Sequence, residues 1–122
     1  MKLSAIRLFV AELSRAKAFY AQTLGLRLAR DGSAQGYCAF ESAGISVIVE
    51  EVASDAPGKE RALVGRFVGL SFAVENVTAE HERLAALGVR FTGFPEKQFW
   101  GGWLATFMDP SGNELQPAQY PA

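Results

Sequence analysis

The apolar residues of the chain first follow the period of a strand and then that of a helix. Every second residue from Ile6 to Val10 is aliphatic, which is typical of a strand with one face packed on apolar neighbours. Apolar residues then recur every three or four positions as far as Leu24. This spacing predicts an amphipathic helix of about three turns, with Ser14 as its N-cap and Gly25 as its stop.

Short runs of strand-forming residues follow this helix and are separated by turn residues. They predict strands at 26–30, 36–41 and 45–52. The first half of the chain is therefore predicted to fold in the order β-α-β-β-β. The next stretch, 53–65, is polar and rich in turn residues, and it joins this half to the second one.

The second half of the chain shows the same order of patterns. A strand is predicted at 70–74, and a helix is predicted to follow with Thr78 as its N-cap and Gly88 as its stop. Short strands are predicted near 89–93, 103–108 and 114–117. The last two are separated by the turn sequence Asp-Pro-Ser-Gly-Asn at 109–113.

The two halves match each other at a nearly constant offset. The stretch 10–13 lies 64 positions before 74–77, and 24–26 lies 63 positions before 87–89. A β-α-β-β-β unit alone leaves one sheet face bare, and pairing two copies covers it. We therefore predict an α+β fold in which two βαβββ modules form a curved mixed β-sheet around a cleft, with the helices on the outer face. The single domain 1–122 is predicted to hold module 1 at about 1–53, a linker at about 54–65 and module 2 at about 66–122.

Charge and cysteine content remove several classes of function. Twelve basic and thirteen acidic side chains give a formal net charge of −1, so the chain lacks the positive field that attracts nucleic acid. The single cysteine, Cys38, lies in an apolar run and is predicted to be a buried free thiol, compatible with a reducing compartment. The N-terminal stretch is interrupted by charge, and no apolar run reaches the length of a membrane span. We expect a cytoplasmic protein without a nucleic-acid or membrane partner.

Two sets of motifs carry a resemblance to a known superfamily. The N-terminal set comprises Val-Ala-Glu-Leu at 10–13, Ala-Phe-Tyr at 18–20 and Leu-Gly-Leu at 24–26. The C-terminal set comprises Trp-Gly-Gly at 100–102 and Phe-Met-Asp-Pro-Ser-Gly-Asn at 107–113. Together they resemble the vicinal-oxygen-chelate superfamily, which includes glyoxalase I, fosfomycin-resistance proteins, ring-cleaving dioxygenases and bleomycin-resistance proteins. The resemblance implies the glyoxalase/bleomycin-resistance fold, but the activity has to be inferred from the residues of the site.

The positions of the superfamily's metal ligands lack suitable donors in this chain. In metal-using members, the resemblance implies a histidine near the start of each module's first strand and a glutamate on its last strand. These positions fall on Ala5 and Gly69 for the histidines and on Gln116 for the second glutamate. The first glutamate falls on Ile48 or Glu50, depending on the register of that strand. Because alanine and glycine have no donor atom and an amide replaces a carboxylate poorly, we predict no metal and no cofactor.

The chain also lacks the set of residues that nucleophilic catalysis needs. The only histidine, His81, lies in the polar stretch of the second predicted helix, where an exposed position without a role is expected. A weak surface metal site with Glu80 or Glu82 is the alternative. One distant histidine cannot complete a Ser-His-Asp or Cys-His set, so no catalytic residue is predicted.

Strand alternation predicts which side chains face the cleft. Arg7 can hold a carboxylate or phosphate in a forked geometry, or pair with Glu50 or Glu114. Trp100 and Trp103 flank two glycines and can cover a flat ligand, or pack on a sheet edge or a second subunit. The predicted ligand-binding residues are Arg7, Phe9, Glu50, Ser71, Trp100, Trp103, Thr106, Met108, Glu114 and Gln116.

Three functions compete at this point. The leading one is a metal-free binding protein of the bleomycin-resistance type, which sequesters a small molecule such as an antibiotic or toxic compound without converting it. The alternative is a metal-dependent glyoxalase- or dioxygenase-like lyase or oxidoreductase with displaced ligands, which needs Glu50 and Glu114. The third is a fold-only module whose cleft is filled by its own Phe9, Met108 and tryptophans. A homodimer is expected, in which the modules pair within a chain or swap between chains.

Overall fold

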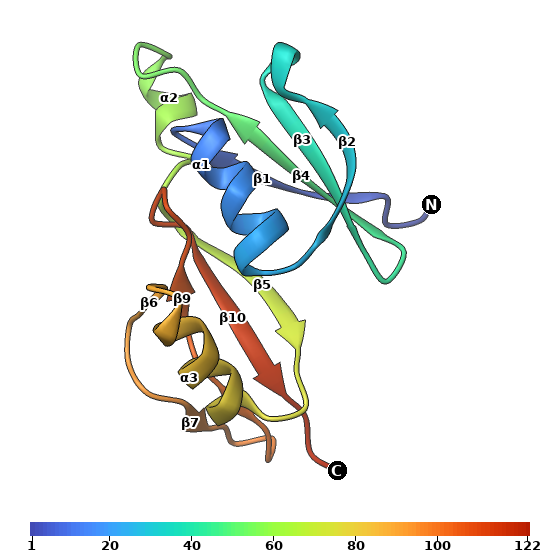
Figure 1. The fold of residues 1–122 in the computed structure, drawn as a ribbon, viewed down its shortest axis with the longest axis vertical. Helices are drawn as coiled ribbons and strands as arrows, with labels where there is room; N and C mark the ends of the chain where they lie inside the picture. Colours follow the sequence, from blue (N-terminus) through green and yellow to red (C-terminus); the bar gives the residue numbers. More distant parts are fainter. The chain divides into compact units, whose positions relative to one another are not determined.

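The computed structural model describes residues 1–122, which divide into two compact units. Unit 1 comprises Met1–Arg66 with Pro110–Gly112, and unit 2 comprises Phe67–Asp109 with Asn113–Ala122. Each unit carries a mixed β-sheet with a helix across one of its faces (Figure 1). The α+β class and the fold expected from the resemblance are confirmed. None of the helices is long and apolar enough to span a membrane.

Unit 1 follows the predicted β-α-β-β-β order. Its elements are β1 (Ala5–Val10), α1 (Leu13–Ala18), the π-helical turn η1 (Phe19–Thr23), β2 (Arg27–Gly32), the 3-10 turn η2 (Ser33–Gln35), β3 (Tyr37–Ser42), β4 (Ile45–Glu51) and α2 (Gly58–Arg61). The four strands pair in the order β1-β4-β3-β2, with β1 parallel to β4 and the other pairs antiparallel. The short helix α2 lies inside the stretch expected to be an irregular linker.

The core of unit 1 lies between α1, η1 and one face of this sheet. Tyr20 and Phe40 are fully buried, with ring centroids 5.9 Å apart. Cys38 is a buried free thiol, as predicted. The other buried apolar residues of this layer are Leu8, Val10, Leu13, Ala16, Phe19, Val47 and Val49.

The first helix begins in a different way from the prediction. It starts at Leu13, one residue before the expected cap Ser14, and Glu12 occupies the N-cap without a side-chain hydrogen bond. The Leu13 N–H instead donates to Oε2 of Glu51 at 2.9 Å. A carboxylate at the end of β4 thus stabilises the first turn of α1, where the helix dipole favours a negative charge. The predicted cap is wrong because a residue distant in sequence takes its place.

Unit 2 repeats this arrangement, with its second and third strands each divided into two short segments. Its elements are β5 (Phe67–Ala73), α3 (Val77–Ala86), β6 (Arg90–Phe91), β7 (Glu96–Lys97), β8 (Trp103–Leu104), β9 (Phe107–Met108) and β10 (Glu114–Gln119). One side of β10 pairs in parallel with β5, and its other side pairs antiparallel with β8 and β9. The strands β6 and β7 complete the sheet by pairing with β9 and β8, respectively. The order of strands is therefore that of unit 1.

The predicted strand 103–108 is divided in two, and Pro117 explains the division. The register pairs Leu115 with Phe107 and Ala118 with Leu104, which places Pro117 opposite Ala105. The Ala105 N–H donates to the Pro117 carbonyl at 3.3 Å, but proline has no N–H to return the bond. The ladder is interrupted there, while β10 itself continues beyond the predicted end at Pro117.

The helix α3 is capped by Asn76 and not by the predicted Thr78. The Asn76 side chain accepts a hydrogen bond from the Ala79 N–H at 3.0 Å. Asparagine is as good an N-cap as threonine, so the pattern identified the helix but missed its first residue by two positions.

The turn before β10 is held by a buried polar pair. Asp109 and Asn113 are 2% and 1% exposed. The Asn113 backbone N–H donates to Asp109 Oδ1 at 2.9 Å, and its side-chain amide donates to Oδ2 at 3.0 Å. Gly112 provides the positive φ of 85° that the turn requires. These bonds fix where β10 begins.

Candidate functional site

In unit 1, a hollow of about 440 Å³ lies on the sheet face opposite the helix. We call it the Arg7 hollow; it is lined by Arg7, Gln35, Gly36, Tyr37, Ile48, Glu50, Glu51 and Ala53. Arg7 Nε lies 2.5 Å from Glu50 Oε2, and Nη2 donates to Oε1 at 2.9 Å. The Arg7 guanidinium also lies 5.2 Å from the centre of the Phe9 ring. The structure thus brings together three predicted site residues.

The charge of Arg7 is already balanced within unit 1. Glu50 raises the pKa of Arg7 through two hydrogen bonds and the ionic attraction between them. Both carboxylate oxygens of Glu50 are engaged by this guanidinium fork. Glu50 engages two of the five N–H groups of Arg7, so an anionic ligand in this hollow would compete with that carboxylate for the guanidinium.

In unit 2, a hollow of about 300 Å³ lies over the interrupted part of the sheet. We call it the Gln116 hollow; it is lined by Thr92, Gly93, Phe94, Glu96, Gln98, Leu104, Ala105, Thr106 and Gln116. Thr106 and Gln116 face each other between the ladder pairs of β8 and β9, and Gln116 Nε2 donates to Thr106 Oγ1 at 3.1 Å. The predicted residues Thr106 and Gln116 thus form the polar floor of this hollow.

A bulge in the outer strand places Phe94 at the rim of the Gln116 hollow. The Thr92 N–H donates to the Thr106 carbonyl at 2.9 Å, whereas Glu96 pairs with Leu104. Residues 93–95 therefore lie opposite Ala105 alone, and they leave the plane of the sheet. Phe94, at the centre of this bulge, is 82% exposed. Phe94 was not among the predicted site residues, although Gly93 and Pro95 on either side of it are the usual signal of an interrupted strand.

The remaining predicted site residues lie elsewhere in unit 2. Ser71 is exposed on β5 and pairs in register with Gln116, while Met108 pairs with Glu114. Trp100 packs against Tyr120 with ring centroids 5.4 Å apart, and its ring occupies the space that a Cβ atom at Gly102 would need. Trp103 lies on β8 and is 37% exposed. None of these five lines the Gln116 hollow.

The register of the sheets shows whether Ile48 or Glu50 occupies the position of the first glutamate ligand. Arg7 pairs with Ile48, and Ser71 pairs with Gln116. Arg7 and Ser71 are separated by the 64-residue offset of the repeat, so Ile48 is the equivalent of Gln116. Glu50 lies two residues further on and is bound to Arg7. The two glutamate positions are thus occupied by an aliphatic residue and an amide, neither of which suits a transition metal.

The backbone also departs from a regular strand at Gly69, where the 64-residue offset of the repeat places the second histidine. Phe67 pairs with Glu114 and Ser71 with Gln116, so β5 contains extra residues at a bulge between these pairs. Gly69 lies in this bulge with a φ of 72°. A histidine there would adopt a conformation that L-residues rarely take. The residues present do not fit the metal that the resemblance implies, and no group of three or more His, Cys, Asp and Glu side chains is placed to hold one.

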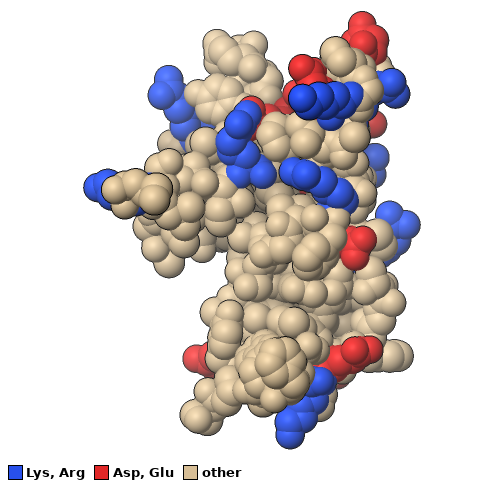
Figure 2. Space-filling view, turned by 180° about the vertical axis from the view of Figure 1, so that it is seen from behind, with Lys and Arg blue, Asp and Glu red and all other residues tan.

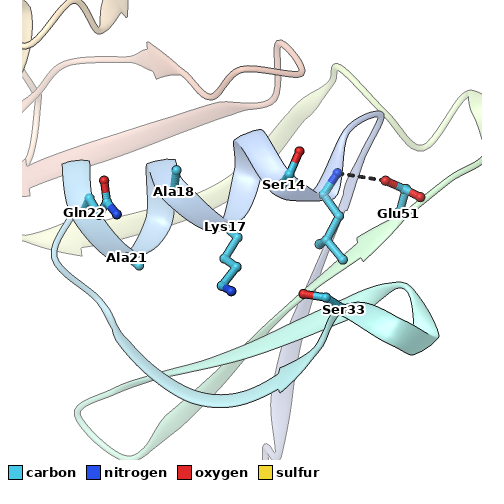
Figure 3. Close-up of a pocket in the computed structure, with 8 residues that line it drawn as sticks. Ser14, Lys17, Ala18, Ala21, Gln22, Ser33 and Glu51 are labelled. Atoms are coloured by element: carbon cyan, nitrogen blue, oxygen red, sulfur yellow. Dashed lines mark hydrogen bonds between the residues drawn. The ribbon is translucent and has the colours of Figure 1, made fainter.

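A third cavity, of about 550 Å³, runs along the first helix of unit 1. It is lined by Leu13, Ser14, Lys17, Ala18, Ala21, Gln22, Ser33 and Glu51 (Figure 3). Figure 3 shows Lys17 extending from the helix toward the strands, whereas Ser14 and Ala18 point away from them. Lys17 Nζ is bound to Asp31 Oδ2 at 2.6 Å. Because its polar groups diverge and its cation is already paired, this groove suits a ligand less well than the Gln116 hollow.

The ion pair beside this groove predicts a pH dependence of stability. Lys17 and the backbone and hydroxyl of Ser33 hold the pKa of Asp31 well below its ordinary value of 3.8. Asp31 therefore stabilises the folded state above that value, and this contribution is lost as the pH falls toward the lower folded-state pKa. The difference in unfolding free energy between wild type and Asp31→Asn is expected to be largest above about pH 5 and to shrink at lower pH. Urea unfolding from pH 2 to 7 measures it; Lys17→Met should weaken the same dependence, and a constant difference would contradict the assignment.

Comparison with known proteins identifies the family of this chain. Residues 2–116 match the model of the Glyoxalase/Bleomycin resistance protein/Dioxygenase superfamily, and the chain belongs to this superfamily. No curated protein matches the chain.

Several solved structures share this fold over almost their whole length. TnmS3, an antibiotic binding protein from Streptomyces sp. CB03234, is 26% identical with a TM-score of 0.77, and the match covers 99% of this chain and 97% of that one. A superfamily member from Sphaerobacter thermophilus is 23% identical with a TM-score of 0.79, covering 98% and 97%. A lactoylglutathione lyase from Agrobacterium tumefaciens is 17% identical with a TM-score of 0.77, covering 97% and 92%. At these lower identities the last two show the fold alone.

Proposed function

We propose that this protein binds a small organic molecule without a metal ion and sequesters it unchanged, in the manner of an antibiotic- or toxin-binding protein. The observation that carries the proposal is the floor of the Gln116 hollow. There, the position of a metal-binding glutamate is an amide that donates a hydrogen bond to Thr106. The likeness to TnmS3, an antibiotic binding protein, supports the same reading.

The lining of the Gln116 hollow favours a flat and largely uncharged ligand. Hydroxyl and amide groups from Thr106, Gln116 and Gln98 offer hydrogen bonds of both directions, and Phe94 offers an exposed ring at the rim. Glu96 is the one charged side chain of the lining. In the view of Figure 2, fewer charged side chains lie over the visible face of unit 2 than over that of unit 1. A planar heteroaromatic amide combines these features.

Quinoline-3-carboxamide is a suitable probe of this proposal. We expect it to bind with a Kd below about 1 mM and to change the fluorescence of the protein, since Trp103 lies beside the lining residue Leu104. Phe94→Ala is expected to weaken binding about three- to tenfold by removing the stacking ring. Calorimetry measures both affinities, and NMR of the recovered probe is expected to show it unchanged.

Two controls make this test decisive. Cyclohexanecarboxamide keeps the amide but lacks the aromatic plane, so it should bind more weakly than the quinoline. Phe99→Ala removes a fully exposed ring that does not line the hollow, and it should leave the affinity unchanged. Absence of binding at millimolar probe, or stoichiometric metal in protein purified without a histidine tag, would count against the proposal.

The cellular setting and the assembly remain predictions from the sequence. We propose a homodimer in the cytoplasm, with the small-molecule ligand as its main partner. The resemblance and the near-neutral charge support this proposal.

A further inference from the structure

Four rings form a continuous row from the core of unit 2 to the rim of the Gln116 hollow. Phe107 is 1% exposed, and its ring lies 5.8 Å from that of Phe91. Phe91 in turn lies 4.2 Å from the imidazole of His81, which lies 5.6 Å from the ring of Phe94. The prediction that His81 is an exposed helix residue is therefore wrong, because it is half-buried and contacts two phenylalanines.

Phe94 lies at the exposed end of this row. It lies at the centre of the bulge between β6 and β7, where no ladder hydrogen bond holds residues 93–95. Its side chain is 82% exposed, and its ring contact in the structure is with His81. A large apolar side chain on such a segment can adopt many rotamers. A contact that restricts these rotamers in the free protein reduces the conformational entropy lost on ligand binding and so favours binding.

We propose that His81 is a positioning residue that holds Phe94 at the rim of the Gln116 hollow, so that a residue of α3 controls the affinity for a flat ligand. The inference rests on the proposed function, because it concerns ligand binding at the Gln116 hollow, and His81 itself does not line that hollow. His81 suits the role because its ring packs against Phe91 and Phe94 in tilted geometry, while its ring nitrogens suit the partly exposed surface of the helix.

The test uses the intact chain and quinoline-3-carboxamide. His81→Ala is expected to weaken binding about three- to tenfold, the range that a lost aromatic contact supports. His81→Phe keeps a ring and is expected to restore the affinity to within about twofold. In a double-mutant cycle, His81→Ala is expected to have no further effect once Phe94 is alanine, because its action passes through that ring. Glu82→Ala, the neighbouring exposed helix residue, is the matched control and should bind as wild type does.

A second measurement does not depend on any ligand. Amide hydrogen exchange of residues 92–98 in the ligand-free protein is expected to be faster in His81→Ala, and to remain at the wild-type rate in His81→Phe and Glu82→Ala. If wild type does not bind the probe, the proposed function fails, and the exchange rates alone decide whether His81 holds the rim. Unchanged exchange in His81→Ala, failure of His81→Phe to rescue, or an additive double mutant overturns the inference.

Discussion

Replacing Phe40 with alanine is expected to lower the free energy of unfolding of unit 1 by about 3–5 kcal/mol. The side chain is fully buried, lies at the centre of the sheet on β3, and contacts Tyr20 from the helical layer. Its removal loses both the transfer free energy of the ring and the contacts of its neighbours, which close such a cavity only in part. Urea unfolding followed by far-UV circular dichroism measures the change.

Ile45→Ala provides the matched comparison for Phe40. Ile45 begins the neighbouring strand β4 and is 38% exposed, so its truncation is expected to cost about 1 kcal/mol or less. If the two variants unfold at the same urea concentration, the core described for unit 1 is wrong.

Asp109→Ala is the second large effect, expected to cost about 2–5 kcal/mol. The substitution leaves the backbone N–H and the side-chain amide of Asn113 without their acceptor, in a residue that is 1% exposed. Each buried donor that loses its partner costs about 1–3 kcal/mol. The same bonds fix the start of β10, so Asp109→Ala is also expected to weaken binding of quinoline-3-carboxamide at the Gln116 hollow.

Two further variants separate this effect from a simple loss of charge. Asp109→Asn keeps one acceptor oxygen and is expected to fall between wild type and Asp109→Ala. Asp55→Ala removes an exposed carboxylate from the connecting stretch and should change stability by less than about 0.5 kcal/mol. Equal urea midpoints for Asp109→Ala and Asp55→Ala would refute the role of the buried pair.

The repeat and the order of elements were predictable because they depend on local periodicity. The first strand, the helix after it and the three strands that follow occur in unit 1 where the pattern places them. The details that were missed depend on partners far away in sequence. Glu51 replaces Ser14 at the start of α1, and Pro117 divides a strand that it faces across the sheet. Neither effect is visible in a window of neighbouring residues.

The candidate site was predictable only where strand alternation is undisturbed. Arg7, Phe9 and Glu50 lie together because β1 and β4 pair without a bulge, and Thr106 and Gln116 meet because the register of β10 continues across Pro117. Phe94 and His81 were not predicted because their positions do not follow strand alternation. A bulge moves Phe94 out of the alternation, and the contact of His81 joins a helix to a sheet edge.

The bulge at Gly69 bears on how this chain relates to the metal-using members of its superfamily. Substitutions at Ala5 and Ile48 would place donor atoms on strands that pair without a bulge, whereas Gln116 lies where the register between β10 and β5 shifts. At position 69, a histidine would have to adopt a left-handed backbone, which costs about 1–2 kcal/mol. In this chain, a histidine at that position would therefore require a change in the path of β5 as well as a change of side chain.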